Sequence, residues 1–190
     1  MCGRFALTVT PAEVQALFGY DEMPNFPPRQ NIAPTDPIAV VVYENGKRQF
    51  KLMRWGLVPA WVKEVEGFPT LFNARSETLT TKPAFRSAAR HRRCLIPADW
   101  FYEWSHDGKQ KRPYRIRRHD HKVFAMAGLW ETYSHPNGSE IDTATIVTTN
   151  ANGTMSALHD RMPVILDEKD FDSWLNAEAH RPETLSTLMA

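Results

Sequence analysis

Runs rich in β-branched and aromatic residues recur through the middle of the chain, with apolar and polar positions alternating. Such runs are typical of strands that bury one face. The predicted strands are Pro37 to Tyr43, Arg48 to Trp55, Trp100 to Trp104, Pro113 to Arg117, Lys122 to Trp130 and Ile141 to Thr149. Residue pairs that favour tight turns separate several of them, namely Asn45-Gly46, Asp107-Gly108 and Asn137-Gly138.

A short helix is predicted near the N-terminus. The segment Thr10-Pro11-Ala12-Glu13 has the form of a capping box with proline at the first helical position. Val14, Leu17 and Phe18 follow it at helical spacing. One face of this helix should therefore be apolar.

Two further helices are predicted, one after Ser76 and one after Asp167. In the second helix, Phe171, Trp174 and Leu175 share one face. The proline-rich stretch from Pro24 to Pro37 is predicted to be a loop that lies over the body of the protein. Together the elements predict a strand-dominated α+β fold.

The composition is that of an ordinary globular protein. Hydrophobic residues make up 42% of the chain and charged residues 24%, values far from those of disordered or fibrous proteins. A chain of 190 residues can bury one sizeable core, so residues 1–190 are expected to form a single domain. Since no stretch approaches the roughly 20 consecutive apolar residues of a membrane helix and no secretory signal is recognisable, a cytoplasmic monomer is expected.

Cysteine and histidine usage argues against a disulfide scaffold or a metal centre. Cys2 and Cys94 are the only cysteines, and they lack the paired spacing of a zinc site. His119 and His121 have no second pair of ligands at suitable spacing, so neither a metal nor another cofactor is expected. Cys94 lies in an apolar run and should be a buried apolar side chain.

Positive charge is unevenly distributed along the chain. Residues 82–118 contain 11 of the 23 lysines and arginines but only 3 of the 22 acidic residues, although the net charge of the whole chain is +1. Arg115 and Arg117 alternate with Tyr114 and Ile116, so one strand can present a basic face and a buried face. This asymmetry suits a surface that binds a polyanion, with a solvated basic loop as the alternative.

Position 2 offers unusual chemistry. Removal of Met1 would leave Cys2 with an α-amine and a thiol on adjacent carbons. An α-amine, with a reference pKa of about 7.7 to 8.0, is partly neutral near pH 7 and can attack an aldehyde, unlike a lysine at about 10.4. The thiol can then close onto the imine carbon and give a thiazolidine. The alternative is that Cys2 is merely a small residue.

Several short segments carry a family resemblance. They are Met1-Cys2-Gly3-Arg4-Phe5, Asn31-Ile32-Ala33-Pro34-Thr35, Arg54-Trp55-Gly56-Leu57-Val58-Pro59 with Trp61, Asn73-Ala74-Arg75-Ser76-Glu77-Thr78, Cys94-Leu95-Ile96-Pro97-Ala98 before Phe101-Tyr102-Glu103-Trp104, and His159-Asp160-Arg161-Met162-Pro163. In this order they resemble the SOS-response-associated peptidase (SRAP) family, whose members shield abasic DNA by cross-linking to it. The resemblance covers nearly the whole chain and implies a barrel-like β core with flanking helices.

The resemblance implies four catalytic residues. Cys2 would be the nucleophile, surrounded by Asn73, Glu103 and His159. The amide of Asn73 can orient the amine without adding charge, and Glu103 can accept a proton from the ammonium group. His159 can protonate the sugar ring oxygen and so open the closed hemiacetal to the aldehyde. Without the family context, a helix cap, an exposed strand carboxylate and a structural histidine are the simpler interpretations.

The resemblance also implies a partner, single-stranded DNA that contains abasic sites. The family holds it in a positively charged channel, with base stacking interrupted by an aromatic or proline wedge. Trp61 could stack on a base, a contact worth roughly 1 to 3 kcal/mol, although a buried core tryptophan is the alternative. The predicted DNA contacts are Arg4, Pro34, Trp61, Arg75, Lys82, Arg86 and Arg161.

The sequence therefore favours covalent capture of abasic sites through a thiazolidine at Cys2, as part of a DNA damage response. Strand cleavage by β-elimination, removal of its own Met1, nucleoid association and contact with replication proteins are secondary expectations. Three alternatives stay open. They are a glutamine amidotransferase with an N-terminal nucleophile, in which Asn73 would help bind the oxyanion, a peptidase with a Cys2 and His159 dyad, and a noncatalytic binder of modified DNA bases.

Overall fold

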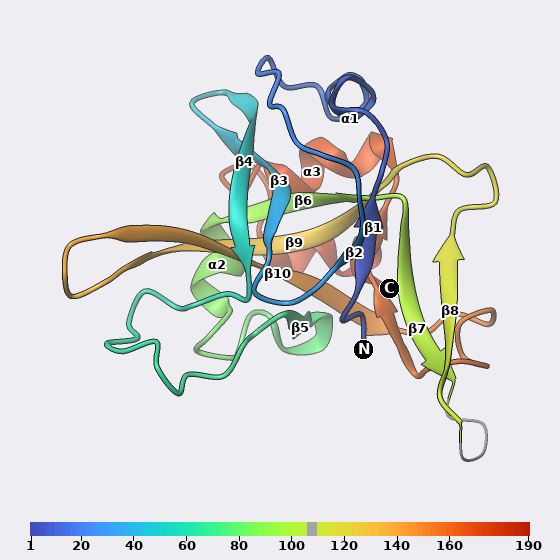
Figure 1. Cartoon of the computed structure of the whole chain (residues 1–190). Coiled ribbons are helices and arrows are strands. Elements are labelled where there is room, and N and C mark those ends of the chain that lie inside the picture. The colour runs from blue at the N-terminus through green and yellow to red at the C-terminus, as the bar shows by residue number, and fades with distance from the viewer. Residues whose placement is uncertain (106–109) are drawn as a thin grey trace.

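Five strands form a closed barrel at the centre of the structure. The computed structural model describes residues 1–105 and 110–190 (Figure 1). The barrel strands are β3 (Pro37–Glu44), β4 (Lys47–Trp55), β6 (Arg93–Ala98), β9 (Phe124–Ser134) and β10 (Glu140–Asn150). Neighbouring strands are antiparallel except for β10 and β4, which run parallel. Because β10 pairs with both β9 and β4, the ring closes on itself.

Three short strands extend the barrel. β5 (Asn73–Arg75) runs parallel to β10 and continues its pairing beyond the end of β4. β11 (Arg161–Pro163) pairs antiparallel with the other edge of the same part of β10, and β12 (Ile165–Leu166) pairs with β9. The C-terminal half of β10 therefore brings β5 and β11 to its two edges.

A second sheet packs beside the barrel and is seen on the right of Figure 1. Its order is β2 (Arg29–Ile32), β1 (Phe5–Leu7), β7 (Trp100–Ser105) and β8 (Arg112–Arg117), with antiparallel neighbours. Its inner face joins the barrel core, where the ring of Phe5 meets that of Trp55 edge to face at 5.1 Å between centroids. The N-terminus is thus held between a barrel and a sheet.

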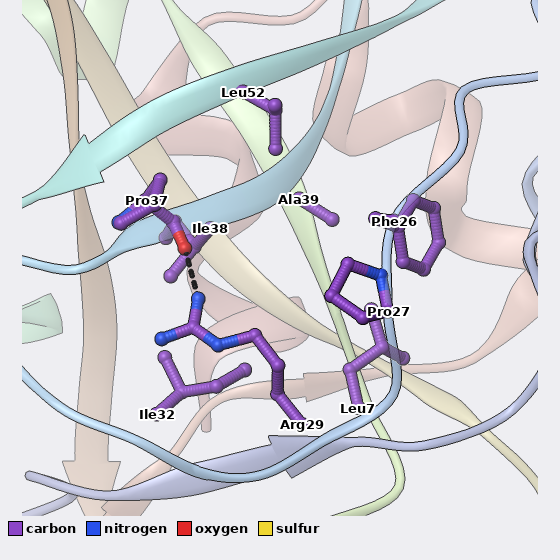
Figure 2. A pocket seen from close by; sticks show the side chains of 9 residues that line it. All are labelled: Leu7, Phe26, Pro27, Arg29, Ile32, Pro37, Ile38, Ala39 and Leu52. Carbon is purple, nitrogen blue, oxygen red and sulfur yellow. Dashed lines mark hydrogen bonds between the residues drawn. The ribbon is translucent and has the colours of Figure 1, made fainter.

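A small apolar pocket opens near the β2 end of this sheet (Figure 2). Leu7, Ile32 and Ile38 are among the side chains that line it. At its rim, the guanidinium of Arg29 donates to the carbonyl of Pro37 at 2.6 Å. This bond ties β2 to the start of β3.

Helices cover the barrel and close its ends. α1 (Pro11–Phe18) has the predicted capping box and ends at Gly19, which has a φ of 68°. The remaining helices are α2 (Arg86–His91), α3 (Phe171–Leu175) and the 3-10 helices Ser76–Thr78, Glu168–Asp170 and Pro182–Met189. Phe18 of α1 stacks on Phe171 of α3 at 5.4 Å between ring centroids, so both ends of the chain contribute to one core. In the described residues, no helix is both long and apolar enough to span a membrane.

The predicted fold class is confirmed, and each predicted strand is present as β3, β4, β7, β8, β9 or β10. Asn45 and Gly46 form the turn between β3 and β4, with φ values of 54° and 77°, as expected of a tight hairpin turn. β9 begins at Phe124 rather than Lys122, after a turn in which His121 has a φ of 60°. The Asp107-Gly108 turn lies outside the described residues.

Two local predictions are wrong. The stretch from Pro24 to Pro37, predicted as a loop, contains β2, because Arg29–Ile32 can pair with the edge of β1. The helix predicted after Ser76 is only a single 3-10 turn, and the α-helix begins ten residues later, at Arg86. Asn73 consequently lies on a strand and does not cap a helix. In both regions tertiary pairing, which local sequence does not encode, decides the structure.

The barrel interior is closely packed around Gly128 on β9. A Cβ at this position would lie 2.8 Å from Sγ of Cys94, 2.8 Å from Cδ1 of Ile96 and 3.1 Å from the carbonyl oxygen of Thr145. These distances are shorter than close-packed interiors allow. The absence of a side chain therefore lets β6, β9 and β10 approach one another.

We predict that Gly128→Ala lowers the free energy of unfolding by about 1 to 3 kcal/mol, because the added methyl group overpacks the barrel. Urea denaturation followed by circular dichroism would measure the change. Gly153→Ala is the matched control, since nothing lies within 4 Å of a Cβ placed there. Equal unfolding midpoints for the two variants would contradict the prediction.

Candidate functional site

The first residues of the chain are held between β5 and β7. Cys2 lies just before β1 and is fully buried. From β5, Nδ2 of Asn73 donates to the carbonyl of Cys2 at 3.1 Å and to that of Phe72 at 2.9 Å. Asn73 therefore fixes the backbone on which the thiol and the peptide nitrogen of Cys2 are mounted. Its Oδ1 is buried and has no hydrogen-bond partner among the described residues.

Glu103 and His159 converge on the amine of Met1. The amine nitrogen lies 3.3 Å from Oε2 of Glu103 and 2.8 Å from Nε2 of His159. Glu103 is on β7 and is buried, whereas its neighbours Tyr102 and Trp104 are half-buried on the other face, as the alternation predicts. A carboxylate, an imidazole and an amine thus meet one residue away from the Cys2 thiol.

A backbone hydrogen bond sets the protonation pattern of His159. The N–H of Arg161 donates to Nδ1 at 2.9 Å. The carboxylate of Asp160 also lies 2.9 Å from Nδ1, but an amide nitrogen always carries its proton, so Nδ1 is the acceptor. In the neutral ring the proton then sits on Nε2. In this tautomer Nε2 donates to the Met1 amine at 2.8 Å when that amine is unprotonated, whereas a protonated amine would reverse the roles.

The thiol of Cys2 is held in its neutral form. Burial raises the pKa of this thiol to about 12, and the nearby Glu103 carboxylate adds to the increase. The Met1 amine and the backbone N–H of Arg4 act in the opposite direction with smaller effect. Near neutral pH the sulfur is a protonated thiol, so an unprotonated amine is the more available nucleophile in this site.

Several predicted DNA contacts have exposed side chains. Arg75 is two residues after Asn73 on β5, so both side chains point to the same side of the strand. Lys82 and Arg86 follow it along the chain, and all three side chains are exposed. Trp61 is 61% exposed and touches Phe68 edge to face at 6.2 Å between ring centroids. The alternative of a buried core tryptophan is therefore excluded for Trp61.

The other predicted contacts are half-buried or buried. The guanidinium of Arg4 donates to Oδ1 of Asn31 at 3.0 Å. Pro34 is half-buried in the turn before β3, which Asp36 holds through a hydrogen bond from the backbone N–H of Ala33 at 3.0 Å. Both residues lie on segments next to β1, so they can line an approach to Cys2.

Arg161 differs from the other arginines predicted to contact DNA because it is buried. Its guanidinium donates to both carboxylate oxygens of Glu77, at 2.6 and 3.0 Å, and to the carbonyl of Thr148 at 2.8 Å. These hydrogen bonds hold the pKa of Glu77 below its usual value. The structure therefore gives Arg161 the task of fixing the strand that follows His159, and phosphate contact by this residue stays a prediction.

The comparisons with known proteins identify the family of this chain. The profile of the family described as SOS response associated peptidase (SRAP) matches residues 1–190. The chain belongs to the SRAP family.

Relatives of this SRAP chain come from bacteria, a phage and eukaryotes. Abasic site processing protein YoqW of Bacillus subtilis is 39% identical over 193 residues, which cover all of this chain and 86% of that protein. Abasic site processing protein HMCES of Xenopus tropicalis is 29% identical, over 93% of this chain and 66% of that protein. A crystal structure of a Bacteroides thetaiotaomicron protein superimposes with a TM-score of 0.91 at 25% identity, covering 99% of this chain and 86% of the other.

Sequence reasoning missed the residues that position the SRAP site. Asn31 holds Arg4, Glu77 holds Arg161, and Tyr133 donates from its hydroxyl to the carbonyl of Lys63 at 3.1 Å, next to the Trp61 loop. Asn31 and Glu77 lie inside the segments that carry the family resemblance, and this position could have marked them as site residues. Tyr133 lies in a strand and carries no signal of its own, because its role depends on a contact 70 residues away. Within the described residues, no group of three or more His, Cys, Asp or Glu side chains could hold a metal ion.

We predict that alkylation of Cys2 by iodoacetamide, in protein that retains Met1, accelerates about tenfold per pH unit from about pH 7 to about pH 10 without a plateau. Only the thiolate reacts, and the pKa of about 12 lies above this range. Peptide mass spectrometry would follow the modified cysteine. Protein unfolded in urea is the control, and its rate should level off above about pH 9, near the ordinary thiol pKa. An alkylation rate that levels off below about pH 9 in the folded protein would contradict the prediction.

Proposed function

We propose that this protein captures abasic sites in single-stranded DNA as a thiazolidine on Cys2, once Met1 has been removed. The observation that carries the proposal is the convergence of Glu103 and His159 on the amine next to the buried thiol of Cys2. The names of relatives such as YoqW and HMCES, abasic site processing proteins, support the substrate class.

Removal of Met1 has two consequences for the site. Hydrolysis of the peptide bond consumes one water, releases methionine and leaves the nitrogen of Cys2 as a free α-amine. The space that Met1 occupied, which reaches solvent because Met1 is 51% exposed, then faces Glu103 and His159. We assign this space to the deoxyribose of the lesion, and we assign the hydrolysis itself to the same side chains.

His159 acts first, on the closed form of the abasic sugar. Its Nε2 carries the proton in the neutral ring because Nδ1 accepts from the backbone of Arg161. Donation of that proton to the ring oxygen breaks the bond between this oxygen and C1′, while the Glu103 carboxylate takes the proton of the C1′ hydroxyl and passes it back to the imidazole, so that neither side chain changes its charge overall. The products are a free hydroxyl and an aldehyde. The same group catalyses the reverse step.

The amine and the thiol of Cys2 then react in turn with the aldehyde carbon. The nitrogen lone pair attacks C1′, and loss of one water gives an imine. The sulfur adds to the same carbon, the S–H proton is passed through Glu103, and the nitrogen gains a proton. The overall reaction joins aldehyde and cysteine with release of one water. The neutral thiol favours this order, in which nitrogen bonds before sulfur.

The exposed residues around the site suit the DNA strand. Arg75 shares its strand face with Asn73 and can hold a phosphate next to the captured sugar. Trp61 can stack on the base beside the lesion, where no partner base is present. Strand cleavage by β-elimination is a side reaction of the imine, because the imine acidifies the neighbouring carbon. Closure by sulfur suppresses it.

We predict that wild-type protein shifts an oligonucleotide with one abasic site to a heat-resistant band on a denaturing gel. Cys2→Ala should abolish this band and leave cleaved strand visible, whereas Cys2→Ser should give only a labile imine that reduction by borohydride traps. An oligonucleotide without the lesion is the control. Equal trapping by all three proteins would remove the thiol from the mechanism, and glutamine hydrolysis without a band would favour an amidohydrolase.

We predict that His159→Gln slows both formation and reversal of the cross-link, by roughly 100-fold if it supplies the general acid and base for ring opening. Single-turnover gels give the forward rate, and transfer to excess unlabelled abasic DNA gives the reverse rate. His119→Gln is the matched control, because His119 is exposed and lies in a turn outside the site. Unchanged rates in both directions would exclude His159 from the chemistry.

A further inference from the structure

The outer face of the β2-β1-β7-β8 sheet carries a row of aromatic side chains. Trp100, Tyr102 and Trp104 alternate along β7 and are half-buried, whereas Phe101, Glu103 and Ser105 point to the inner face and are buried. The rings of Tyr102 and Trp104 lie 6.4 Å apart at an angle of 38°. Neighbouring aromatic rings that remain partly open to solvent can serve as a stacking platform for nucleic acid bases.

Arginines of β8 lie on the same face as this aromatic row. The register places Arg117 opposite Trp100 and Arg115 opposite Tyr102, and opposed residues of an antiparallel pair share a face. The guanidinium of Arg115 lies over the Trp100 ring, 4.8 Å from its centroid. Such an arginine keeps its outward N–H groups available for a phosphate.

The two arginines of this face carry positive charge that acidic side chains do not offset. In residues 1–105 and 110–190, the arginines that form ion pairs are Arg29, Arg48, Arg92, Arg118 and Arg161. Arg115 and Arg117 are exposed and are not among them. The closest carboxylate on β7, that of Glu103, is buried on the opposite face. This face would therefore attract a polyanion.

This face adjoins the N-terminal segment that carries Cys2. Tyr102 donates from its backbone N–H to the carbonyl of Arg4 at 2.9 Å, so Arg4 lies beside the aromatic row and two residues from Cys2. On the other side, the carbonyl of Cys2 accepts a hydrogen bond from Asn73, the first residue of β5. The exposed Arg75 is the last residue of the same strand. Cys2 thus lies between two basic regions, one on β5 and the segment after it, the other on β7 and β8.

We propose that the outer face of β7 and β8, defined by Trp100, Tyr102, Trp104, Arg115 and Arg117, binds the single-stranded DNA on one side of the lesion. This inference rests on the proposed function and extends it, because the residues from Arg75 to Arg86 then bind the other side. Bases stack on the rings, and the arginines contact phosphates. Binding is independent of sequence and sensitive to salt.

This surface can be tested by measuring cross-linking rates on two abasic oligonucleotides, one of about 4 and one of about 16 nucleotides. These lengths span the site sizes of surfaces that bind single strands. The double variant Arg115→Ser/Arg117→Ser should match wild type on the short oligonucleotide and lose about tenfold on the long one. The matched control Arg90→Ser/Arg181→Ser removes the same charge from exposed positions outside this face and should match wild type on both. Equal rates for all three proteins on the long oligonucleotide would overturn the proposal.

Equilibrium binding of an undamaged oligonucleotide separates this inference from the covalent chemistry. For the Arg115→Ser/Arg117→Ser variant, the slope of log affinity against log salt should decrease in magnitude by about 1.4, as expected for two lost phosphate contacts on a single strand. If wild type fails to cross-link but shows this difference, only the proposed function fails. If wild type cross-links and the slopes are equal, the face does not bind DNA, as expected if β8 instead pairs with a strand of another protein.

Discussion

The buried carboxylate of Glu103 and the amine it contacts hold the site together. Removing a carboxylate from water is costly unless a cation or hydrogen-bond donors replace the lost hydration. Here the N-terminal amine lies 3.3 Å from Oε2 of Glu103. This pairing, with the bond from Asn73 to the Cys2 carbonyl, keeps Cys2 buried, although chain termini are usually poorly ordered.

The barrel determines where the groups around that terminus come from. β10 carries β5 on one edge and β11 on the other, so Asn73 and Arg161, which are 88 residues apart in the sequence, lie on the two edges of one strand. β7 supplies Glu103 from the neighbouring sheet. Asn73 and Glu103 lie on paired strands, and Cys2 and His159 lie within three residues of one, so strand pairing restricts the positions of all four candidate residues.

Much of the fold could be predicted from the sequence, because alternating strands and the α1 capping box are local signals. The four catalytic candidates could be named from family segments, and the structure brings all four together. The features that could not be predicted depend on contacts between residues far apart in the sequence. β2 forms only because an edge of β1 is available, and the burial of Arg161 depends on Glu77 across the fold. A buried arginine and a phosphate-binding arginine look the same in sequence, since only the partners distinguish them.

The depth at which Cys2 lies has a consequence for its survival in the cell. Peroxides oxidise thiolates to sulfenic acid far faster than they oxidise thiols. A fully buried sulfur with a pKa of about 12 offers almost no thiolate. In the chain that retains Met1, the cysteine should therefore stay reduced during oxidative stress.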